Sequence, residues 1–366
     1  MSISFHTFIF HFSFLFGFAV AGIPCFASGA DMEFVRISKD NRSFVLERSG
    51  KIFPPLGFNY DHDENGRLIE DYWVNEWLKL EEDFREMKEL GANVVRIHLQ
   101  VAKFMSNPDQ PTTQSLHKLK DLLELSRSLE LRLDITGLGC YHKHDVPKWY
   151  DELSEKERWR VQANFWEAIA KTCAGNPAVF CYNLMNEPLV PGEKRKPGDW
   201  LAPPFGGKCF VQFITLDRAD RPGSDIAKDW IRQLTTSIRK HDKKTLITTG
   251  MFNLKFGTSL DPKELADELD YISVHIYPER GKVGEAVENL KMFQVGKPIV
   301  IEEIFPLNCH ISDIEEFMNA SREIASGWIG FYWGKTMEEC RRSGTIGDAI
   351  TAEWLRFFQE NLAQRR

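Results

Sequence analysis

The alternation of strand-like and helix-like segments constrains the fold of this chain more than any other sequence feature. Eight short runs rich in β-branched and aromatic residues recur along its 366 residues, separated by stretches with apolar residues at helical spacing. Such repetition is typical of a parallel sheet covered by helices, the α/β class. Eight units with no compositional break favour one closed (β/α)8 barrel over two domains. The predicted strands are Leu56–Tyr60, Asn93–His98, Leu131–Thr136, Ala178–Met185, Thr245–Thr249, Tyr271–Tyr277, Pro298–Glu303 and Trp328–Trp333.

Helices are predicted between these strands, where apolar residues recur every three or four positions. The clearest runs from Trp77 to Leu90 and stops at Gly91, a residue type that commonly ends helices. Ahead of the barrel, Phe34–Ile37 and Ser43–Leu46 flank turn-forming residues and predict a short N-terminal β-hairpin. The other predicted helices are Ser115–Leu129, Glu157–Cys173, Ser224–Lys240, Val283–Phe293, Ile311–Ser326 and Ala349–Leu362.

The first thirty residues predict a secretory signal peptide. They contain no Lys, Arg, Asp or Glu, and the run from Phe8 to Ala21 is almost wholly apolar, although a basic start is missing. Small residues precede the first charged residue, Asp31, which indicates cleavage after Ala30. We therefore expect a single catalytic domain over 31–366 that is secreted or periplasmic; an uncleaved membrane anchor is the alternative. No later stretch has membrane length, so no membrane association is expected after the signal is removed.

Charge and cysteine usage narrow the function classes. A net charge of −7 argues against nucleic acid as a partner, because phosphate backbones are bound by basic surfaces. A neutral carbohydrate would be indifferent to that charge. The six cysteines after residue 30 are irregularly spaced and leave their pairing open, and no CxxC pair of the zinc-binding kind is present. We expect no metal and no other cofactor; the oligomeric state stays open.

Two glutamates occupy the places where barrel enzymes carry their chemistry. Glu187 follows the fourth predicted strand, and Glu303 ends the seventh. An ionised group at the end of an apolar strand is costly unless it has a purpose, and active sites lie at the carboxyl ends of barrel strands. Each glutamate alone could be a rim residue paired with an arginine. Both together predict a catalytic pair.

The order of several motifs resembles the cellulase-like glycoside hydrolases of family 5, in clan A. The motifs are Leu-Gly-Ala-Asn-Val-Val-Arg at 90–96, Asn186-Glu187-Pro188, His275-x-Tyr277, Lys297-Pro298 through Glu303, and Trp333. The resemblance covers about 34–333. The hairpin leading into Gly57-Phe58-Asn59-Tyr60 and the Glu302-Glu303 pair look most like the β-mannanase branch.

The resemblance implies a retaining double displacement on β-1,4-linked polysaccharide, mannan, glucomannan or β-glucan. Glu303 would be the nucleophile and Glu187 the general acid/base, about 5 Å apart on opposite sides of the bond. The other implied roles belong to substrate-binding residues. Arg96 would hold Glu303 ionised, Asn186 would bind the sugar 2-hydroxyl, Tyr277 would contact the nucleophile, His275 would lie near the acid/base, and Trp333 would stack on a sugar.

Two positions bear on how closely the chain follows that family. Many members carry Asp-x-His at the end of strand three, where this chain has Asp134-Ile135-Thr136, so sugar recognition beside the nucleophile is expected to differ. Strand alternation predicts that Glu302 points away from Glu303, toward the helices or a hydrogen-bonded pocket.

Loop composition leaves the mode of action open. The long Pro- and Gly-rich segment 189–225 follows Glu187 and predicts a cleft wall or lid. Trp73, Trp77 and Trp149 are candidates for distant sugar subsites. An exo-acting glycosidase on short oligosaccharides is the alternative to an endo-acting enzyme, and a carbohydrate-binding barrel without catalysis is a remote one. The choice between gluco and manno substrates stays open.

Overall fold

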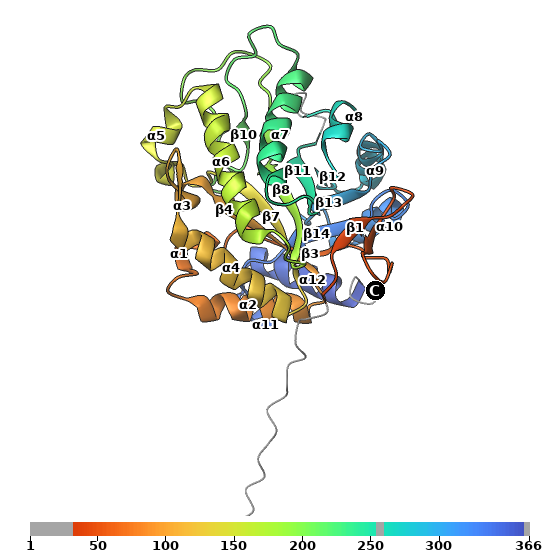
Figure 1. The fold of residues 1–366 in the computed structure, drawn as a ribbon. Helices are drawn as coiled ribbons and strands as arrows, with labels where there is room; N and C mark the ends of the chain where they lie inside the picture. Colours follow the sequence, from red (N-terminus) through yellow and green to blue (C-terminus); the bar gives the residue numbers. More distant parts are fainter. Residues whose placement is uncertain (1–31, 254–259, 362–366) are drawn as a thin grey trace, which may run out of the picture.

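The computed structural model describes residues 32–253 and 260–361 and closes eight parallel strands into a barrel (Figure 1). Around the barrel the strands run β3, β4, β7, β8, β11, β12, β13, β14, and β14 pairs with β3 in parallel register to close it. The predicted (β/α)8 barrel is confirmed. The strands are β3 Leu56–Tyr60, β4 Val94–Gln100, β7 Arg132–Gly139, β8 Val179–Asn186, β11 Leu246–Met251, β12 Ile272–His275, β13 Ile299–Glu303 and β14 Gly327–Phe331.

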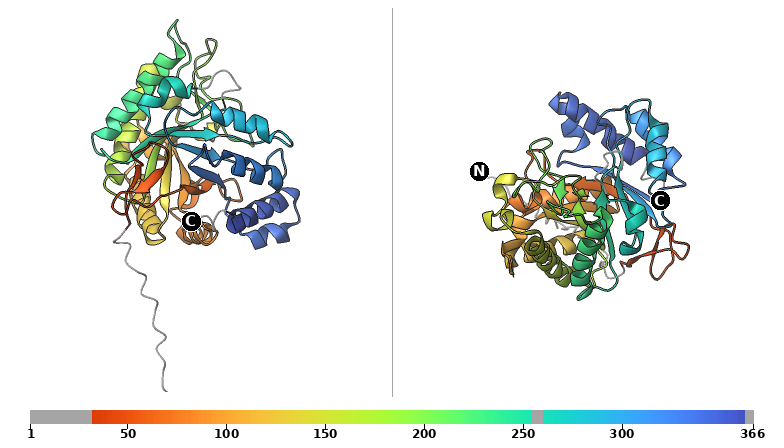
Figure 2. Two further views of the ribbon diagram at one scale, coloured as in Figure 1. Left: turned by 90° about the vertical axis from the view of Figure 1, so that its right-hand side faces the viewer. Right: turned by 90° about the horizontal axis from the view of Figure 1, so that it is seen from above.

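Helices surround the barrel, as the two views of Figure 2 show. Their apolar faces pack on the outer side of the strands, and buried residues of both layers form one continuous core. The longer helices are α2 Trp77–Glu89, α4 Thr113–Ser128, α6 Glu155–Cys173, α7 Gly223–Arg239, α9 Val283–Lys291, α10 Ile311–Ser321 and α12 Ile346–Asn361; the shorter are α1 Ile69–Tyr72, α3 Val101–Phe104, α5 Lys148–Asp151, α8 Pro262–Leu265 and α11 Met337–Ser343.

Two predicted strands extend too far at their carboxyl ends. The strand predicted to reach Tyr277 ends at His275, and the one predicted to reach Trp333 ends at Phe331. In both places apolar sequence continues past the last ladder hydrogen bond, because these side chains pack on the barrel mouth rather than within the sheet. Similarly, the helix predicted over Ile311–Ser326 ends at Ser321.

The N-terminal hairpin closes the barrel at the end opposite the candidate site. Strands β1 (Val35–Ile37) and β2 (Phe44–Leu46) pair antiparallel, as predicted. Phe44 is fully buried and meets Phe180 and Tyr271 edge-on, with ring centroids 5.3 and 5.2 Å away. These rings belong to a second apolar cluster that holds inward-facing residues of the strands. The hairpin therefore seals the bottom of the barrel.

Several short elements complete the described chain. They are β5 Met105–Asn107, β6 Gln110–Pro111, β9 Pro188–Leu189, β10 Gln212–Phe213 and the 3-10 turns at Lys143–Asp145 and Ala266–Glu268. In 32–253 and 260–361 no helix is both long and apolar enough to cross a membrane. The predicted signal peptide and its cleavage after Ala30 lie outside the described residues.

Candidate active site

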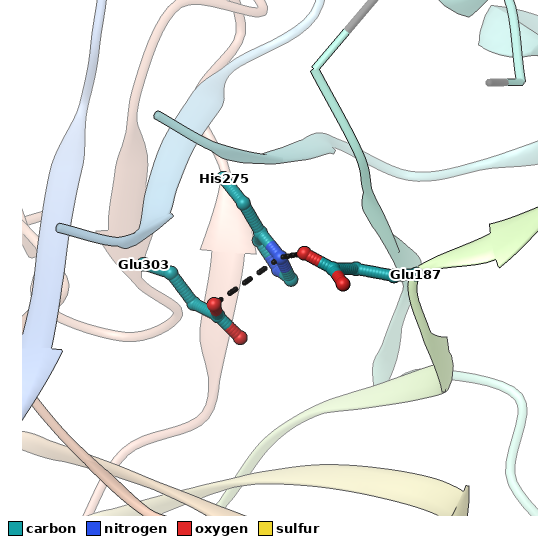
Figure 3. A group of neighbouring side chains, drawn as sticks. All are labelled: Glu187, His275 and Glu303. Atoms are coloured by element: carbon teal, nitrogen blue, oxygen red, sulfur yellow. Dashed lines mark hydrogen bonds and ion pairs between the residues drawn. The ribbon is translucent and has the colours of Figure 1, made fainter. Parts of the chain in front are cut away.

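Glu187 and Glu303 meet at the carboxyl end of the barrel, on either side of His275 (Figure 3). One oxygen of each carboxyl group and a ring nitrogen of His275 all lie within 4.8 Å of one another. Both side chains are nearly buried, with residue exposures of 6% for Glu187 and 8% for Glu303. The two predicted carboxylates therefore share one small, largely dry space.

The backbone aims Glu187 into this space from beyond the end of β8. Its φ is +46°, a left-handed conformation that is uncommon for a residue with a side chain. The Glu187 N–H donates to the carbonyl of Gly250 at 3.0 Å, and its carbonyl accepts from the N–H of Gln212 at 3.4 Å. Strain of this kind persists where neighbouring contacts hold the turn, and it is common at active sites.

Glu303 receives a hydrogen bond on each carboxylate oxygen. Arg96 Nη1 donates to Oε1 at 2.7 Å, and the Tyr277 hydroxyl donates to Oε2 at 2.5 Å. Arg96 is fully buried, so its attraction for Glu303 is weakly screened. The charge-assisted hydrogen bond from Arg96 and the bond from Tyr277 fix the orientation of the carboxylate.

The guanidinium of Arg96 organises the floor of the site. Besides Glu303, it donates to Thr136 Oγ1 at 2.8 Å, Asn59 Oδ1 at 2.8 Å and Asn186 Oδ1 at 2.7 Å. Thr136 stands where many family 5 relatives carry histidine. Here its hydroxyl oxygen accepts a hydrogen bond from Arg96 Nε, so this departure orients the arginine that binds Glu303.

His275 lies between the two carboxylates and beside a third. Its Nδ1 is 2.8 Å from Glu187 Oε1 and 3.4 Å from Glu303 Oε2, and its Nε2 is 3.5 Å from Glu302 Oε2. Burial alone would lower the pKa of His275, but the charge of Glu303, the hydrogen bond with Glu187 and the Glu302 carboxylate beside Nε2 raise it to about 9. His275 is therefore a cation at neutral pH.

The environment of Glu187 favours its protonated form. Burial raises the pKa of this carboxyl group, and the charge of Glu303 adds to that effect, while the hydrogen bond from His275 opposes it. Glu303, by contrast, accepts from an arginine and a tyrosine. Two neighbouring carboxyl groups in unlike surroundings are the arrangement that separates an acid from a nucleophile.

Glu302 lies where alternation did not predict it. Val274 on β12 pairs with Ile301, but the next residue, His275, pairs with Glu303, so β13 carries one extra residue at Glu302. A bulge of this kind breaks the two-residue alternation. Glu302 consequently points into the barrel, fully buried, and its Oε2 accepts from Asn183 Nδ2 at 2.8 Å. Its predicted orientation toward the helices was wrong, although the hydrogen-bonded pocket is present.

Trp333 lies at the mouth, directly after β14, with its indole N–H donating to Asp61 Oδ1 at 2.9 Å. The ring of His62 is nearly parallel to it, with centroids 5.6 Å apart, and Phe331 is stacked at 5.2 Å. The indole is thus held in a fixed orientation and remains partly exposed. Its stacking on a sugar stays a prediction.

Several polar residues of the site were not predicted from the sequence. Asn59 at the end of β3 donates to the Glu302 carbonyl at 2.8 Å while its Oδ1 accepts from Arg96. His98 is neutral, because burial and then the charge of Arg96 hold its pKa well below the ordinary value. Its Nδ1 meets the Tyr141 hydroxyl at 2.5 Å. The available signal was position: His98 follows Arg96 by two residues, Asn59 is the last but one residue of β3, and Tyr141 lies two residues beyond β7.

The segment 189–225 lies against the catalytic face, consistent with a cleft wall. The carbonyl of Phe210 accepts from Asn186 Nδ2 at 3.1 Å, and the ring of Phe210 packs edge-on against Tyr141. Phe205 is 71% exposed at the rim. Of the tryptophans predicted as distant subsites, Trp73 is 1% exposed and belongs to the core, so that prediction was wrong for it.

Among the described residues, the one cluster with metal-ligand spacing is Glu187, His275 and Glu303. Its members also contact one another directly, since His275 Nδ1 is 2.8 Å from Glu187 Oε1 and 3.4 Å from Glu303 Oε2. The six cysteines of the described chain are free thiols, and five of them are buried.

Comparisons with known proteins agree with this geometry. Three solved structures share the fold: an exo-β-1,4-mannosidase from Opitutaceae bacterium strain TAV5 (16% identity, TM-score 0.65, 90% of this chain and 63% of that one), an endo-1,4-β-mannanase from Eisenia fetida (15%, 0.58, 90% and 96%) and a β-1,4-D-mannanase from Cryptopygus antarcticus (15%, 0.60, 89% and 94%). This chain thus spans less than two thirds of the exo-mannosidase. No curated protein matches its sequence significantly.

The family itself is shown by sequence. The model of the cellulase family, glycosyl hydrolase family 5, matches residues 50–336, which hold every strand of the barrel and both glutamates at its mouth. The predicted family is therefore confirmed: the chain belongs to glycosyl hydrolase family 5 and is an O-glycosyl hydrolase.

Proposed function

We propose that this enzyme cleaves β-1,4-linked mannan or glucomannan with retention of configuration, with Glu303 as nucleophile and Glu187 as general acid/base. The separation of the two carboxyl groups carries the proposal. Their nearest oxygens lie within 4.8 Å, whereas an inverting enzyme needs about 6.5–9.5 Å between its carboxyl groups to admit a water.

The proposed reaction has two halves. Glu303 attacks the anomeric carbon as the bond to the leaving oxygen breaks, and that oxygen takes the proton of Glu187. Glu187, now ionised beside the His275 cation, then removes a proton from the water that hydrolyses the glycosyl ester. Asn186 uses one amide N–H on Phe210 and keeps a second for the sugar 2-hydroxyl.

A hollow beside Glu187 is suited to the leaving part of the substrate. It measures about 410 Å³, within the range of small-ligand pockets, and Glu187 and Tyr277 line it but Glu303 does not. The acid must face the leaving oxygen, so we assign the leaving group to this side. The exposed ring of Phe205 and the partly exposed Leu307 provide apolar surface along it.

Two sequence features support specificity for mannose-containing substrates, the hairpin leading into Gly57–Tyr60 and the Glu302-Glu303 pair. The solved structures that share the fold of this chain include mannanases and an exo-mannosidase. We propose further that residues 1–30 direct export, as the uncharged apolar run and the small residues before Asp31 indicate. An N-terminus at Asp31 in the exported protein would support this.

The test is hydrolysis of galactomannan, glucomannan, carboxymethylcellulose and xylan by wild type and by Glu303→Gln. We expect release from the mannans and a loss of at least about 10⁴-fold in the variant, as removal of a nucleophile typically gives. Glu316→Gln, an exposed acid on α10, is the matched control and should keep full activity. Mixed oligosaccharide products mean endo action; monosaccharide or disaccharide alone means exo action.

Activity confined to carboxymethylcellulose would replace mannan by glucan as the substrate. Full activity of Glu303→Gln on any polymer would overturn the assignment of the nucleophile. Wild-type binding to a polymer without release of any product would favour a carbohydrate-binding barrel.

A further inference from the structure

A buried acid, Asp134, lies below the site and takes no part in the double displacement. It occupies β7 next to Arg96 on β4 and is fully buried. Neither of its carboxylate oxygens accepts a hydrogen bond from an N–H or O–H donor in the described chain, and neither does Glu302 Oε1. A buried carboxylate oxygen without a donor is costly, and Asp134 has two such oxygens and Glu302 has one.

Asp134 and Glu302 are within hydrogen-bonding reach of each other. Two ionised carboxylates in contact in a dry interior repel strongly, whereas a single shared proton turns the contact into a strong hydrogen bond. One proton between them would also provide the partner that their free oxygens lack.

The surroundings decide which acid keeps the proton. Glu302 Oε2 accepts a hydrogen bond from Asn183 Nδ2 at 2.8 Å and forms ion pairs with Arg96 Nη2 at 3.4 Å and His275 Nε2 at 3.5 Å, so one amide donor and two cations face it. Asp134 also lies beside Arg96, whose charge favours an ionised Asp134, but it accepts no hydrogen bond from that guanidinium. Its other neighbour is the thiol of Cys181. The negative charge therefore belongs on Glu302.

We propose that Asp134 is a neutral carboxylic acid whose O–H donates a hydrogen bond to Glu302, and that Glu302 is the buried anion that keeps His275 charged and oriented between Glu187 and Glu303. Both are positioning residues. The proposal rests on the function proposed above, since it assigns His275 a task in that reaction.

The directions of the pKa changes agree with this assignment. Burial and then the charge of Glu302 raise the pKa of Asp134 well above the ordinary range. Burial would also raise the pKa of Glu302, but the charge of Arg96 and hydrogen bonds from His275 and Asp134 lower it to about 2. The groups that face this pair are Arg96 from β4, Cys181 and Asn183 from β8, Tyr271 and His275 from β12, and Glu303 from β13.

The charges then balance at every stage. At rest, the cations Arg96 and His275 offset the anions Glu302 and Glu303, while Asp134 and Glu187 are neutral acids. Formation of the glycosyl ester removes the charge of Glu303 and creates one on Glu187. His275 Nδ1 lies 2.8 Å from Glu187 and 3.4 Å from Glu303, so the same cation serves the new anion without a change in buried net charge.

The test measures the pKa of His275 by NMR of histidine-labelled protein without substrate. The His275 signal is assigned by its absence from His275→Gln. We expect Glu302→Gln to lower this pKa by about 1 or more, because a facing anion is lost. Asp134→Asn retains an N–H donor toward Glu302 and should leave the His275 pKa within about 0.3 of wild type. For comparison, a change of one pKa unit corresponds to about 1.4 kcal/mol in the interaction of the His275 charge with its surroundings.

Infrared spectroscopy reports the proton directly. The difference spectrum of wild type minus Asp134→Asn at neutral pH should contain the C=O stretch of a protonated carboxylic acid. An ionised carboxylate band in its place, or a His275 pKa that falls as far in Asp134→Asn as in Glu302→Gln, would place a negative charge on Asp134 and overturn the proposal. An unchanged His275 pKa in Glu302→Gln would overturn it too.

Kinetics separate this proposal from the assignment of the nucleophile. Glu302→Gln should lower kcat about 10-fold or more and leave KM nearly unchanged. Thermal melting of each variant checks that the fold persists. Inactive wild type on all glycosides would defeat the proposed function, whereas the NMR and infrared results stand apart from activity.

Discussion

At the scale of single residues, the site separates two glutamates by their surroundings. Glu187 is buried against a cation, and Glu303 accepts two short hydrogen bonds from Arg96 and Tyr277. The pH dependence of the reaction should report this difference. Burial raises the pKa of Glu187. Its carboxyl group therefore stays protonated at pH values above the ordinary carboxyl pKa, and it loses its proton only as the pH rises through the raised pKa.

We therefore expect kcat/KM on mannan to persist above the ordinary glutamate pKa of 4.5 and to fall about 10-fold per pH unit beyond its alkaline limb. Glu187→Gln should abolish that limb. The same substitution should lower the rate of mannan hydrolysis far more than the rate of hydrolysis of an aryl β-mannoside, because a good aryl leaving group departs without needing a proton. Equal losses on the two substrates would exclude Glu187 as the acid.

The sequence predicted these charged residues better than the polar residues that support them. Glu187, Glu303 and Arg96 stand at strand ends, where a charge in an apolar run is conspicuous. Asn59 and Tyr141 are ordinary in sequence, and their task follows only from what the barrel closure brings beside them. The orientation of Glu302 depended on a bulge, which alternation cannot predict.

At the level of helices and strands, close packing depends on a glycine in a strand where an aromatic ring of a helix lies directly against the backbone. Gly330 on β14 faces Trp354 of α12, and a Cβ at that glycine would lie 1.8 Å from the indole. Trp354 is fully buried, and its indole N–H donates to the Phe331 carbonyl at 3.0 Å. The helix therefore docks on the strand only if the strand carries no side chain at this position.

Gly330→Ala should lower the free energy of unfolding by about 1–3 kcal/mol or more, because α12 must shift to admit a methyl group. Gly284→Ala on α9 is the matched control: a Cβ there meets no atom within 4 Å, and alanine favours the helix by about 0.5–1 kcal/mol. Denaturant unfolding of both variants measures the contrast. Equal stabilities would show that α12 packs on β14 more loosely than the structure has it.

Strand and helix positions were predictable to within a few residues because each buried face repeats with its own period. The ends of the strands were harder to predict. Tyr277 and Trp333 were predicted as strand residues because the apolar sequence continues beyond the last hydrogen bonds between the strands. The fold of segment 189–225 was not predictable, because it rests on contacts such as that between Phe210 and Asn186.

At the scale of the whole molecule, the two ends of the barrel have separate tasks. The carboxyl end holds the charged site, and the opposite end is closed by the hairpin and its aromatic cluster. Stability and catalysis should therefore respond to different substitutions.

Phe44→Ala should lower the free energy of unfolding by about 3–5 kcal/mol, the usual cost of emptying a buried aromatic site. KM for mannan should stay within about twofold at a temperature where the variant is folded. Chemical denaturation and steady-state kinetics on the same preparation test both statements. A large rise in KM would connect the hairpin to the catalytic face.

The parallel seam between β3 and β14 joins the first strand of the barrel to the last, and Arg96 and Glu303, on either side of it, are 207 positions apart. At about 5–20 residues per second of synthesis, Glu303 follows Arg96 by about 10–40 s. Throughout that interval the growing chain holds an open sheet edge and an arginine without its counter-charge. Hydrolytic activity thus arises only after the last strands of the barrel have been synthesised, and the nascent chain depends on protection of its unpaired edge until then.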